Sequence, residues 1–321
     1  MKLVAVDLGG TNARFAIAEL HADRRPTLGT ARKYRTADHA GLADAWAAFA
    51  RDEGGSLPDA ACIAIAGPVE GELIRFTNNS WTIRPSTLAG ELGLRSLTLI
   101  NDFAAMAAAV GVLTEEELVP LGGPDGPLPE TGVTTVIGPG TGLGVAQLVR
   151  RHGRRIVLPT EGGHLDFAAL DGFEEKLLGR LRERHRRVSI ERIVSGPALA
   201  DIHETLAMVG GLAIVPRDDA SLWQAAIDGV DVLAAQALDR LVMSFGAVAG
   251  DLALAHGANA VVVTGGLANR IEARLKGPLF HDRFRAKGRF EARMGHFPIR
   301  LARHPEAGLL GAAAAFQEEQ A

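Results

Sequence analysis

Apolar residues occur along the chain in short continuous runs that are separated by turn-forming residues or by longer stretches of mixed polarity. Two runs, residues 3–8 and 14–19, flank a turn at Gly9-Gly10-Thr11-Asn12 and predict an opening β-hairpin. We expect further strands at residues 62–66, 97–100, 133–137, 143–149, 260–264 and 297–301, and helices at 42–51, from Asn101 onward and at 309–317. Most of the remaining stretch before residue 260 is predicted to be helical. Strands that alternate with helices predict an α/β fold.

A second glycine-rich turn, from Gly138 through Gly140, Thr141 and Gly142, separates the strands predicted at residues 133–137 and 143–149. The strand–glycine turn–strand pattern weakly repeats that of the opening hairpin. Residues 121–129 are rich in glycine and proline, and we interpret them as a surface loop near a domain boundary. The length of 321 residues favours two domains.

Charge and composition limit the classes of partner. The net charge of −4 gives no reason to expect a nucleic acid or an acidic membrane surface. No apolar stretch approaches about 18 uninterrupted residues and no signal peptide is evident, so we expect a cytoplasmic protein without a membrane span. Cys62 is the single cysteine, so it forms no internal disulfide, and we expect it to be a buried core residue.

Two helical segments receive structural interpretations. The basic run at residues 180–187, with Glu174 and Glu175 upstream, is typical of a solvated helix face rather than of a nucleic-acid surface. A stripe of apolar residues at helical spacing, which we expect to be core, comprises Leu199, Ile202, Leu206 and Val209.

The two glycine turns are the first candidates for chemistry. Glycines let backbone amides converge on an anion, and Asp7 at a strand end can hold a hydrated Mg²⁺. No G-x-x-x-x-G-K-[ST] run is present. Each turn alone is equally compatible with an ordinary hairpin. Two turns that each contain a threonine could instead clamp one polyphosphate.

Asn101 and Asp102 stand where a predicted strand ends and a helix begins, the edge at which open α/β sheets bind ligands. A helix N-terminus favours a negative side chain, so Asp102 should stay ionised and could accept a proton from a hydroxyl. The alternative is simple helix capping, a role that both residue types fill well.

Three further sites pair a polar or glycine-rich segment with an ordinary structural alternative. Glu161 and His164, in a Glu-Gly-Gly-His run, offer the acceptors and donors that a sugar hydroxyl needs, although a surface loop would also explain them. Glu191 follows Ser189 and could simply lie in the first turn of a capped helix. Gly265-Gly266 form a strand-to-helix corner that either approaches an adenosine or merely turns the chain.

Together, and in this order, these segments resemble the bacterial glucokinases of the hexokinase–actin superfamily. The resemblance runs from the first predicted strand to the last helix. The matching segments are residues 7–14 (DLGGTNAR), 77–81 (TNNSW), 100–103 (INDF), 140–146 (GTGLGVA), 161–167 (EGGHLDF), 189–197 (SIERIVSGP), 264–266 (TGG) and 308–311 (GLLG).

The resemblance implies a fold and an activity. The fold would be the two-domain actin-like (ribonuclease H-like) ATPase fold with a central cleft. Its small α/β domain would comprise residues 1–112 and 305–321, and its large domain residues 113–304. The activity would be ATP-dependent phosphorylation of glucose to glucose 6-phosphate, the first step of glycolysis, by a homodimer.

The resemblance also implies site roles. Asp102 would be the general base. The sugar would be bound by Asn101, Asp102, Glu161, His164 and Glu191. ATP would be bound by Asp7, Gly9, Gly10, Thr11, Asn12, Gly138, Gly140, Thr141, Gly142, Gly265 and Gly266, with Mg²⁺ held by Asp7 through water.

One departure and two alternatives belong to this hypothesis. The related ROK sugar kinases carry a cysteine-rich zinc motif after their Glu-x-Gly-His, whereas Leu165-Asp166-Phe167 follows here. His164 is therefore expected to bind sugar rather than zinc. The chain could also phosphorylate mannose, fructose or an amino sugar, or it could be a sugar sensor without turnover.

Overall fold

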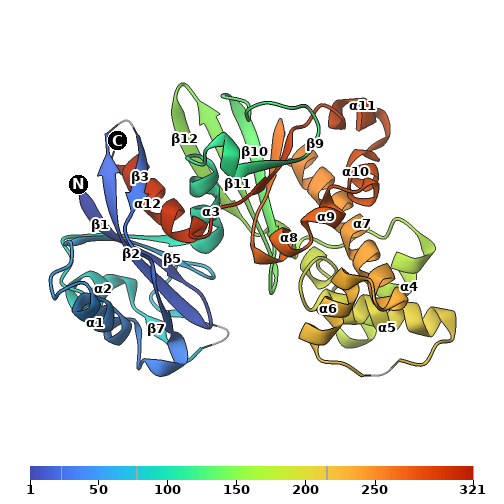
Figure 1. Ribbon diagram of the computed structural model, residues 1–321, viewed down its shortest axis with the longest axis horizontal. Coiled ribbons are helices and arrows are strands. Elements are labelled where there is room, and N and C mark those ends of the chain that lie inside the picture. Colours follow the sequence, from blue (N-terminus) through green and yellow to red (C-terminus); the bar gives the residue numbers. More distant parts are fainter. Residues whose placement is uncertain (23, 77–78, 215, 321) are drawn as a thin grey trace. The chain divides into compact units, whose positions relative to one another are not determined.

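The computed structural model describes residues 1–22, 24–76, 79–214 and 216–320, and it forms two compact units (Figure 1). Unit 1 contains Met1–Thr114, Gly153–Pro159 and His304–Ala321, and unit 2 contains Glu115–His152 and Thr160–Arg303. Residues 153–159 therefore group with unit 1, whereas the sequence assigned them to the large domain. Two residues of the glucokinase-like segment 77–81, Thr77 and Asn78, lie outside the described residues.

Unit 1 is built on a sheet in the order β3-β2-β1-β5-β8, with β4 also paired to β2. The predicted hairpin is confirmed, because β1 and β2 pair antiparallel from Lys2↔Glu19 to Leu8↔Ala13. The strands are β1 (Lys2–Leu8), β2 (Asn12–His21), β3 (Arg24–Leu28), β4 (Arg32–Arg35), β5 (Ala60–Ile65) and β8 (Ser96–Asn101), with a separate pair of β6 (Ile74–Arg75) and β7 (Thr82–Ile83).

The pleat of β1 sends alternate side chains into two different cores. Val4 and Val6 face the cluster that contains Trp46 and Phe49 of α1 (Leu42–Asp52). Leu3 and Ala5 face the opposite cluster, under α3 (Asp102–Val110) and α12 (Ala307–Glu319). Figure 1 shows α1 and α2 (Pro85–Glu91) on one face of the sheet and α12 on the other. Cys62 is fully buried in the second core, as predicted, and burial raises the pKa of its thiol.

The second sheet has the order β12-β11-β10-β13-β14-β9; its strands belong to unit 2 except β12, all but the last residue of which groups with unit 1. Its strands are β9 (Leu118–Gly122), β10 (Gly132–Pro139), β11 (Leu143–Arg151), β12 (Arg154–Thr160), β13 (Ala260–Val263) and β14 (Ile299–Ala302). The sequence missed β9 and β12. Both are edge strands, and both contain a proline, a residue that lowers the apparent strand propensity but is tolerated at an edge.

Helices make up most of the rest of unit 2. They are α4 (Gly172–Arg184), α5 (Ala198–Gly210), α6 (Asp219–Asp228), α7 (Val232–Ala255), α8 (Gly266–Arg270), α9 (Glu272–Leu275), α10 (Pro278–Arg285) and α11 (Glu291–Met294). Short 3₁₀ turns occur at Thr36–Asp38 and Glu115–Glu117, and at Gly162–His164, Ile190–Arg192 and Gly288–Phe290.

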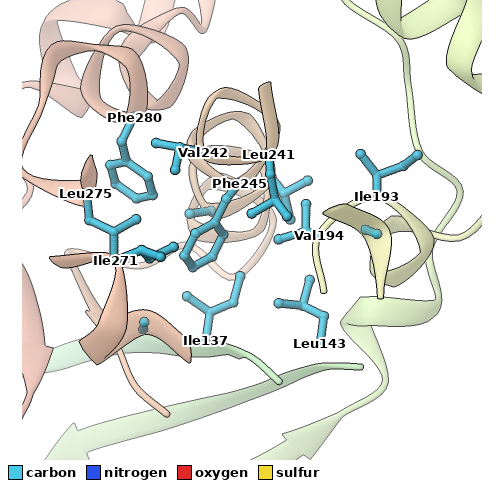
Figure 2. Packing of buried hydrophobic residues seen from close by; sticks show 14 of the residues in the cluster. Ile137, Leu143, Ile193, Val194, Leu241, Val242, Phe245, Ile271, Leu275 and Phe280 are labelled. Carbon is cyan, nitrogen blue, oxygen red and sulfur yellow. The ribbon is translucent and has the colours of Figure 1, made fainter. Parts of the chain in front are cut away.

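Helix α7 is the centre of the core of unit 2. Figure 2 shows Leu241, Val242 and Phe245 of α7 packed among Ile137 of β10 and Phe280 of α10. By length and composition α7 is apolar enough to cross a membrane, but 61% of its most apolar window is buried inside the unit. Its hydrophobicity is therefore accounted for by its place in the core.

Three expectations from the sequence need correction. Val209 is 45% exposed, because it lies in the last turn of α5 beyond the packed part of the stripe. Glu174 is buried, not solvated, and its carboxylate accepts hydrogen bonds from the amide of Leu170 (2.6 Å) and the hydroxyl of Ser244 (3.2 Å). The stretch at 121–129 begins inside β9 instead of being entirely loop.

A buried arginine fixes the loop that follows β9. Arg300 is 3% exposed, and its guanidinium donates to the carbonyls of Pro124 (2.7 Å) and Gly126 (2.8 Å). Carbonyl acceptors satisfy the donors of this buried cation, although burial still lowers its pKa.

Candidate functional site

The first glycine turn joins β1 to β2 in unit 1, and hydrogen bonds fix its backbone. The amide of Gly9 donates to the carbonyl of Asn12 (3.0 Å). The carbonyl of Gly10 accepts from Thr36 Oγ1 (2.9 Å) and from Asn79 Nδ2 (3.1 Å), and the amide of Thr36 donates to the carbonyl of Thr11 (3.0 Å). The turn is therefore held from outside by side chains that lie far away in the sequence.

Asp7 is the charged residue beside this turn. Arg14, directly opposite in the strand pairing, donates from Nη1 to Asp7 Oδ2 at 3.2 Å, and Arg14 Nε lies 3.9 Å from Glu306 Oε2. A Cβ on Gly308 of α12 would lie 2.7 Å from Asp7 Cγ, so glycine is needed there. Burial raises the pKa of Asp7 above its ordinary value, and Arg14 opposes this shift.

Asn101 and Asp102 stand at the N-terminus of α3, where the sequence predicted either capping or chemistry. Asn101 Oδ1 accepts from the amides of Phe103 (2.8 Å) and Ala104 (3.2 Å), and its Nδ2 donates to the carbonyl of Gly67 (3.1 Å). The capping alternative therefore holds for Asn101. Asp102 occupies the first turn, and its Oδ1 accepts from the amide of Phe103 at 2.9 Å.

The second glycine turn joins β10 to β11 in unit 2. The amide of Gly140 donates to the carbonyl of Gly142 (2.8 Å), and the carbonyl of Gly140 accepts from the amide of Gly196 (2.7 Å). A Cβ on Gly140 would meet no atom within 4 Å, whereas one on Gly142 would lie 2.6 Å from Glu191 Oε2. Neither residue has a positive φ, so these glycines provide space rather than an unusual backbone conformation.

The corner after β13 needs glycine for its conformation. Gly265 has φ 98°, which disfavours a side chain, and its carbonyl accepts from the amide and from Nδ2 of Asn269. Gly266 begins α8, and a Cβ there would meet nothing within 4 Å. The predicted strand-to-helix turn is present, and it leaves the backbone of Gly266 uncovered by neighbouring side chains.

Three predicted sugar ligands come together in unit 2. His164 Nδ1 lies 3.6 Å from Glu191 Oε1, and His164 Nε2 lies 3.8 Å from Glu161 Oε2. The side chains of His164 and Glu161 are 56% and 69% exposed, and that of Glu191 is 25% exposed. The imidazole therefore stands between two carboxylates, with polar atoms accessible to a ligand.

Close packing of backbone positions this cluster. Gly163 lies so near the carbonyl of Leu143 that a Cβ would clash with it, which seats the Gly162–His164 turn against the start of β11. Residues 165–167 then pair with 188–190: the amide of Ile190 donates to the carbonyl of Leu165 (2.8 Å), and that of Phe167 to Val188 (3.1 Å). This pairing brings Glu191 beside His164. Ser189 is the N-cap residue of the Ile190–Arg192 turn and Glu191 lies in its first turn, as the capping alternative had it, but the Ser189 side chain makes no capping hydrogen bond.

The sequence did not identify the residues that support the site. Thr36 and Asn79 hold the first turn, Arg14 pairs with Asp7, and Arg187 donates to the carbonyl of His164 and to Asp166. Arg14 and Asn79 lie within the segments 7–14 and 77–81 that carry the resemblance, although no role was assigned to them there. No sequence signal marks Thr36 or Arg187, because their partners are distant in the chain. Within the described part of the chain, no group of three or more His, Cys, Asp or Glu side chains could hold a metal ion.

Comparison of the sequence with known proteins identifies the family. The sequence model of the family described as Glucokinase matches residues 3–319. Glucokinase of Zymomonas mobilis is 52% identical over 98% of this chain and 98% of its own length. Glucokinase of Xanthomonas oryzae is 40% identical over 97% of this chain and 94% of its own length.

Solved structures give the same result for the fold. A glucokinase from an Antarctic psychrotroph is 33% identical, with a TM-score of 0.86 and 98% of both chains covered. A ROK family glucokinase from Streptomyces griseus, crystallised with glucose and AMPPNP, has a TM-score of 0.61 at 21% identity, with 98% of both chains covered. The fold is the actin-like ATPase fold, as the sequence predicted.

Proposed function

Because this chain belongs to the glucokinase family, we infer that it transfers the terminal phosphoryl group of ATP to glucose. The family match extends from residue 3 to residue 319, so it includes both glycine turns and every candidate site residue. The product is glucose 6-phosphate, which enters glycolysis. Phosphoryl transfer asks a protein mainly for positioning and for neutralisation of charge, and the described residues are suited to both tasks.

One observation carries the assignment of the sugar site. Glu191 lies beside His164 and also against Gly142, where even a single Cβ would come within 2.6 Å of its carboxylate. Side chains that can bind hydroxyls are thus in contact, through Glu191, with the glycine turn that contains Gly142. A sugar whose hydroxyl receives a phosphoryl group needs this combination. Glu161, His164 and Glu191 bind the sugar hydroxyls.

Asp102 is the general base for the 6-hydroxyl of glucose. A helix N-terminus favours the ionised carboxylate, which accepts the hydroxyl proton as the oxygen attacks the γ-phosphate. Asn101 has a mainly positioning part, because its side-chain oxygen is engaged in capping α3 and one amide hydrogen is donated to Gly67. Its second amide hydrogen is the group that it offers to the sugar.

Backbone amides of the two turns, Gly9 to Asn12 and Gly138 to Gly142, bind the phosphates, and Gly265-Gly266 accommodate the adenosine. Asp7 fits a hydrated Mg²⁺, because burial raises its pKa and a nearby cation would relieve that cost. A single carboxylate suits Mg²⁺, which keeps several waters and binds mostly to phosphate oxygens. When bound, the ion neutralises phosphate charge.

Two further expectations belong to the same proposal. The enzyme acts in the cytoplasm, and it is a homodimer. Selectivity for glucose arises because a hydroxyl-binding side chain that loses its water on binding is left unpaired when a hydroxyl is missing from the substrate.

A coupled assay of ATP consumption over a panel of hexoses, with direct detection of glucose 6-phosphate, tests the proposal. We expect the highest kcat/KM for glucose, with mannose, fructose and amino sugars weaker. Preferred turnover of another hexose would keep the chemistry and refute the substrate. Sugar binding without turnover from any phosphoryl donor would refute the kinase and favour a sensor.

A further inference from the structure

Arg187 makes two contacts beside the sugar cluster that no role has yet explained. Its Nη2 donates to the main-chain carbonyl of His164, and its Nε donates to the carboxylate of Asp166. The first contact is to the backbone of a residue that we assign to glucose binding. The basic run at 180–187, which the sequence presents as a solvated helix face, therefore ends in a residue directed at the site.

The two contacts cross the pairing that builds the cluster. The segment with Leu165 and Phe167 pairs with the segment with Val188 and Ile190, and a bridge joins Asp166 to Ser189. Arg187 belongs to the second segment and binds the first. It thereby ties the backbone of His164 to the chain that leads, four residues later, to Glu191.

Backbone pairing fixes the chain after His164, and Arg187 adds a contact at the His164 carbonyl itself. The side chain of His164 lies 3.6 Å from Glu191, too far for a direct hydrogen bond, and it is 56% exposed. The glycines before it are packed by their backbone, and the carbonyl of Leu165 after it accepts from the amide of Ile190. The contact of Arg187 to the carbonyl between these two points further restricts the orientation of the His164 peptide group.

The guanidinium suits this task because its donors form a rigid, planar fork. Nε and Nη2 lie on one edge of the fork, so a carbonyl and a carboxylate oxygen that are both bound to it are held at a fixed separation. A lysine offers one ammonium and cannot reproduce that geometry. An exposed ion pair contributes only about 0–1 kcal/mol to stability, so the main effect should fall on geometry.

We propose that Arg187 is a positioning residue for glucose: it orients His164 relative to Glu191 by holding the His164 carbonyl and Asp166 together. This inference rests on the proposed function, because that function identifies glucose as the ligand of Glu161, His164 and Glu191. It predicts an effect on the KM for glucose that is separate from effects on ATP and on folding.

The test compares Arg187→Met with Arg184→Met in the full chain. Arg184 is the matched control, because it belongs to the same basic run, has a similar exposure and pairs instead with Asp201. We expect Arg187→Met to raise the KM for glucose roughly tenfold, with the KM for ATP and the melting temperature close to those of Arg184→Met. Arg187→Lys should recover little, and Asp166→Asn should raise the KM for glucose about twofold.

Three results would overturn the inference: equal glucose KM values in the two methionine variants, full rescue by lysine, or a parallel rise in both KM values with a lowered melting temperature. Glucose affinity from calorimetry provides the same comparison without turnover. If the wild-type chain bound glucose but never phosphorylated it, the proposed function would be refuted. The ratio of the glucose affinities of Arg187→Met and Arg184→Met would still decide the role of Arg187.

Discussion

The two glycine hairpins have the same topology but carry different side chains. In unit 1, β1 pairs antiparallel with β2 and parallel with β5, which pairs parallel with β8. In unit 2, β10 pairs in the same ways with β11 and β13, and β13 with β14. Three positions before the Gly-Thr pair stands Asp7 in the first hairpin and Ile137 in the second, where Ile137 is fully buried in the core (Figure 2).

This difference shows that the shared topology provides a turn, whereas single side chains decide what the turn does. Asp7 gives the first hairpin a carboxylate, and we propose that unit 1 supplies the charge and the base for phosphoryl transfer. Ile137 gives the second hairpin a core contact, so its turn offers backbone alone. The polar residues near it come from elsewhere, as Glu161, His164 and Glu191.

The largest effect is expected for Asp102→Ala in unit 1. Loss of a general base should lower kcat by roughly 10²–10⁴-fold, because the attacking hydroxyl keeps its proton longer. Asp102→Asn should behave similarly, since an amide has the shape but not the basicity. Steady-state kinetics with saturating glucose and ATP would measure this, and near-wild-type turnover in either variant would remove Asp102 from the role.

Asp7→Asn should affect MgATP without weakening the fold. Because burial raises the folded pKa of Asp7 above its ordinary value of 3.8, its ionised form destabilises the fold at neutral pH, and this cost disappears as the pH falls through the raised pKa. The variant should therefore unfold at no lower urea concentration, while kcat/KM for MgATP falls roughly 10–100-fold. A marked loss of stability with unchanged MgATP kinetics would mean that Asp7 is structural.

Gly142→Ala should produce a smaller effect, in which the KM for glucose rises as well as the KM for ATP. The new Cβ would lie 2.6 Å from Glu191 Oε2, so Glu191 must move. We expect the KM for glucose to rise about tenfold. Gly140→Ala is the matched control, because its Cβ meets nothing within 4 Å; it should leave the glucose KM unchanged and affect ATP alone. Equal glucose KM values in the two variants would contradict the placement of Glu191 in the sugar site.

The smallest effect is a difference in acid stability between the units. In unit 2, Nδ1 of His256 forms a hydrogen bond with the hydroxyl of Thr135 of β10 (2.9 Å), and burial lowers the pKa of His256 below 6.5. The imidazole of His256 therefore takes up a proton at higher pH in the unfolded chain than in the folded one. The free energy of unfolding is unaffected by this histidine above about pH 6.5, and it decreases as the pH falls below that value, by at most about 1.4 kcal/mol per pH unit. His281, also in unit 2, has the same sign.

Amide hydrogen exchange at pH 7.5 and pH 5.5 would measure this difference. Protection of β10 should fall at the lower pH, and that of β1 should change less. His256→Gln should reduce the loss in β10. Equal changes in both strands, unaltered by the substitution, would show that these histidines do not set the acid sensitivity.

Much of the fold could be predicted from local pattern. Continuous apolar runs such as Cys62 to Ala66 and residues 260–264 identified central strands, because both faces of such strands are buried. The edge strands of the second sheet gave no comparable signal: β12, for example, mixes arginines with apolar residues and contains Pro159. Glu174 was misread because its buried carboxylate accepts a hydrogen bond from Ser244, seventy residues away, which no local pattern indicates.

The sequence predicted the side chains that bind ligands in the candidate site, but it did not predict all the residues that position them. Gly-rich turns and the Glu-Gly-Gly-His run are local signals, and the structure brings Glu161, His164 and Glu191 together. Arg187 could not be found in this way. Its partners are fixed by pairing between distant segments, and neither its residue type nor its spacing distinguishes it from a surface residue.

Glucose binding by Asp102→Ala and Glu191→Gln, measured by calorimetry beside kcat, tests the assignment of base and sugar ligand most directly. We predict that Asp102→Ala keeps much of its glucose affinity and loses nearly all turnover, whereas Glu191→Gln loses affinity for glucose, keeps its KM for ATP and still turns over at saturating sugar. Loss of glucose binding in Asp102→Ala with normal binding in Glu191→Gln would contradict it.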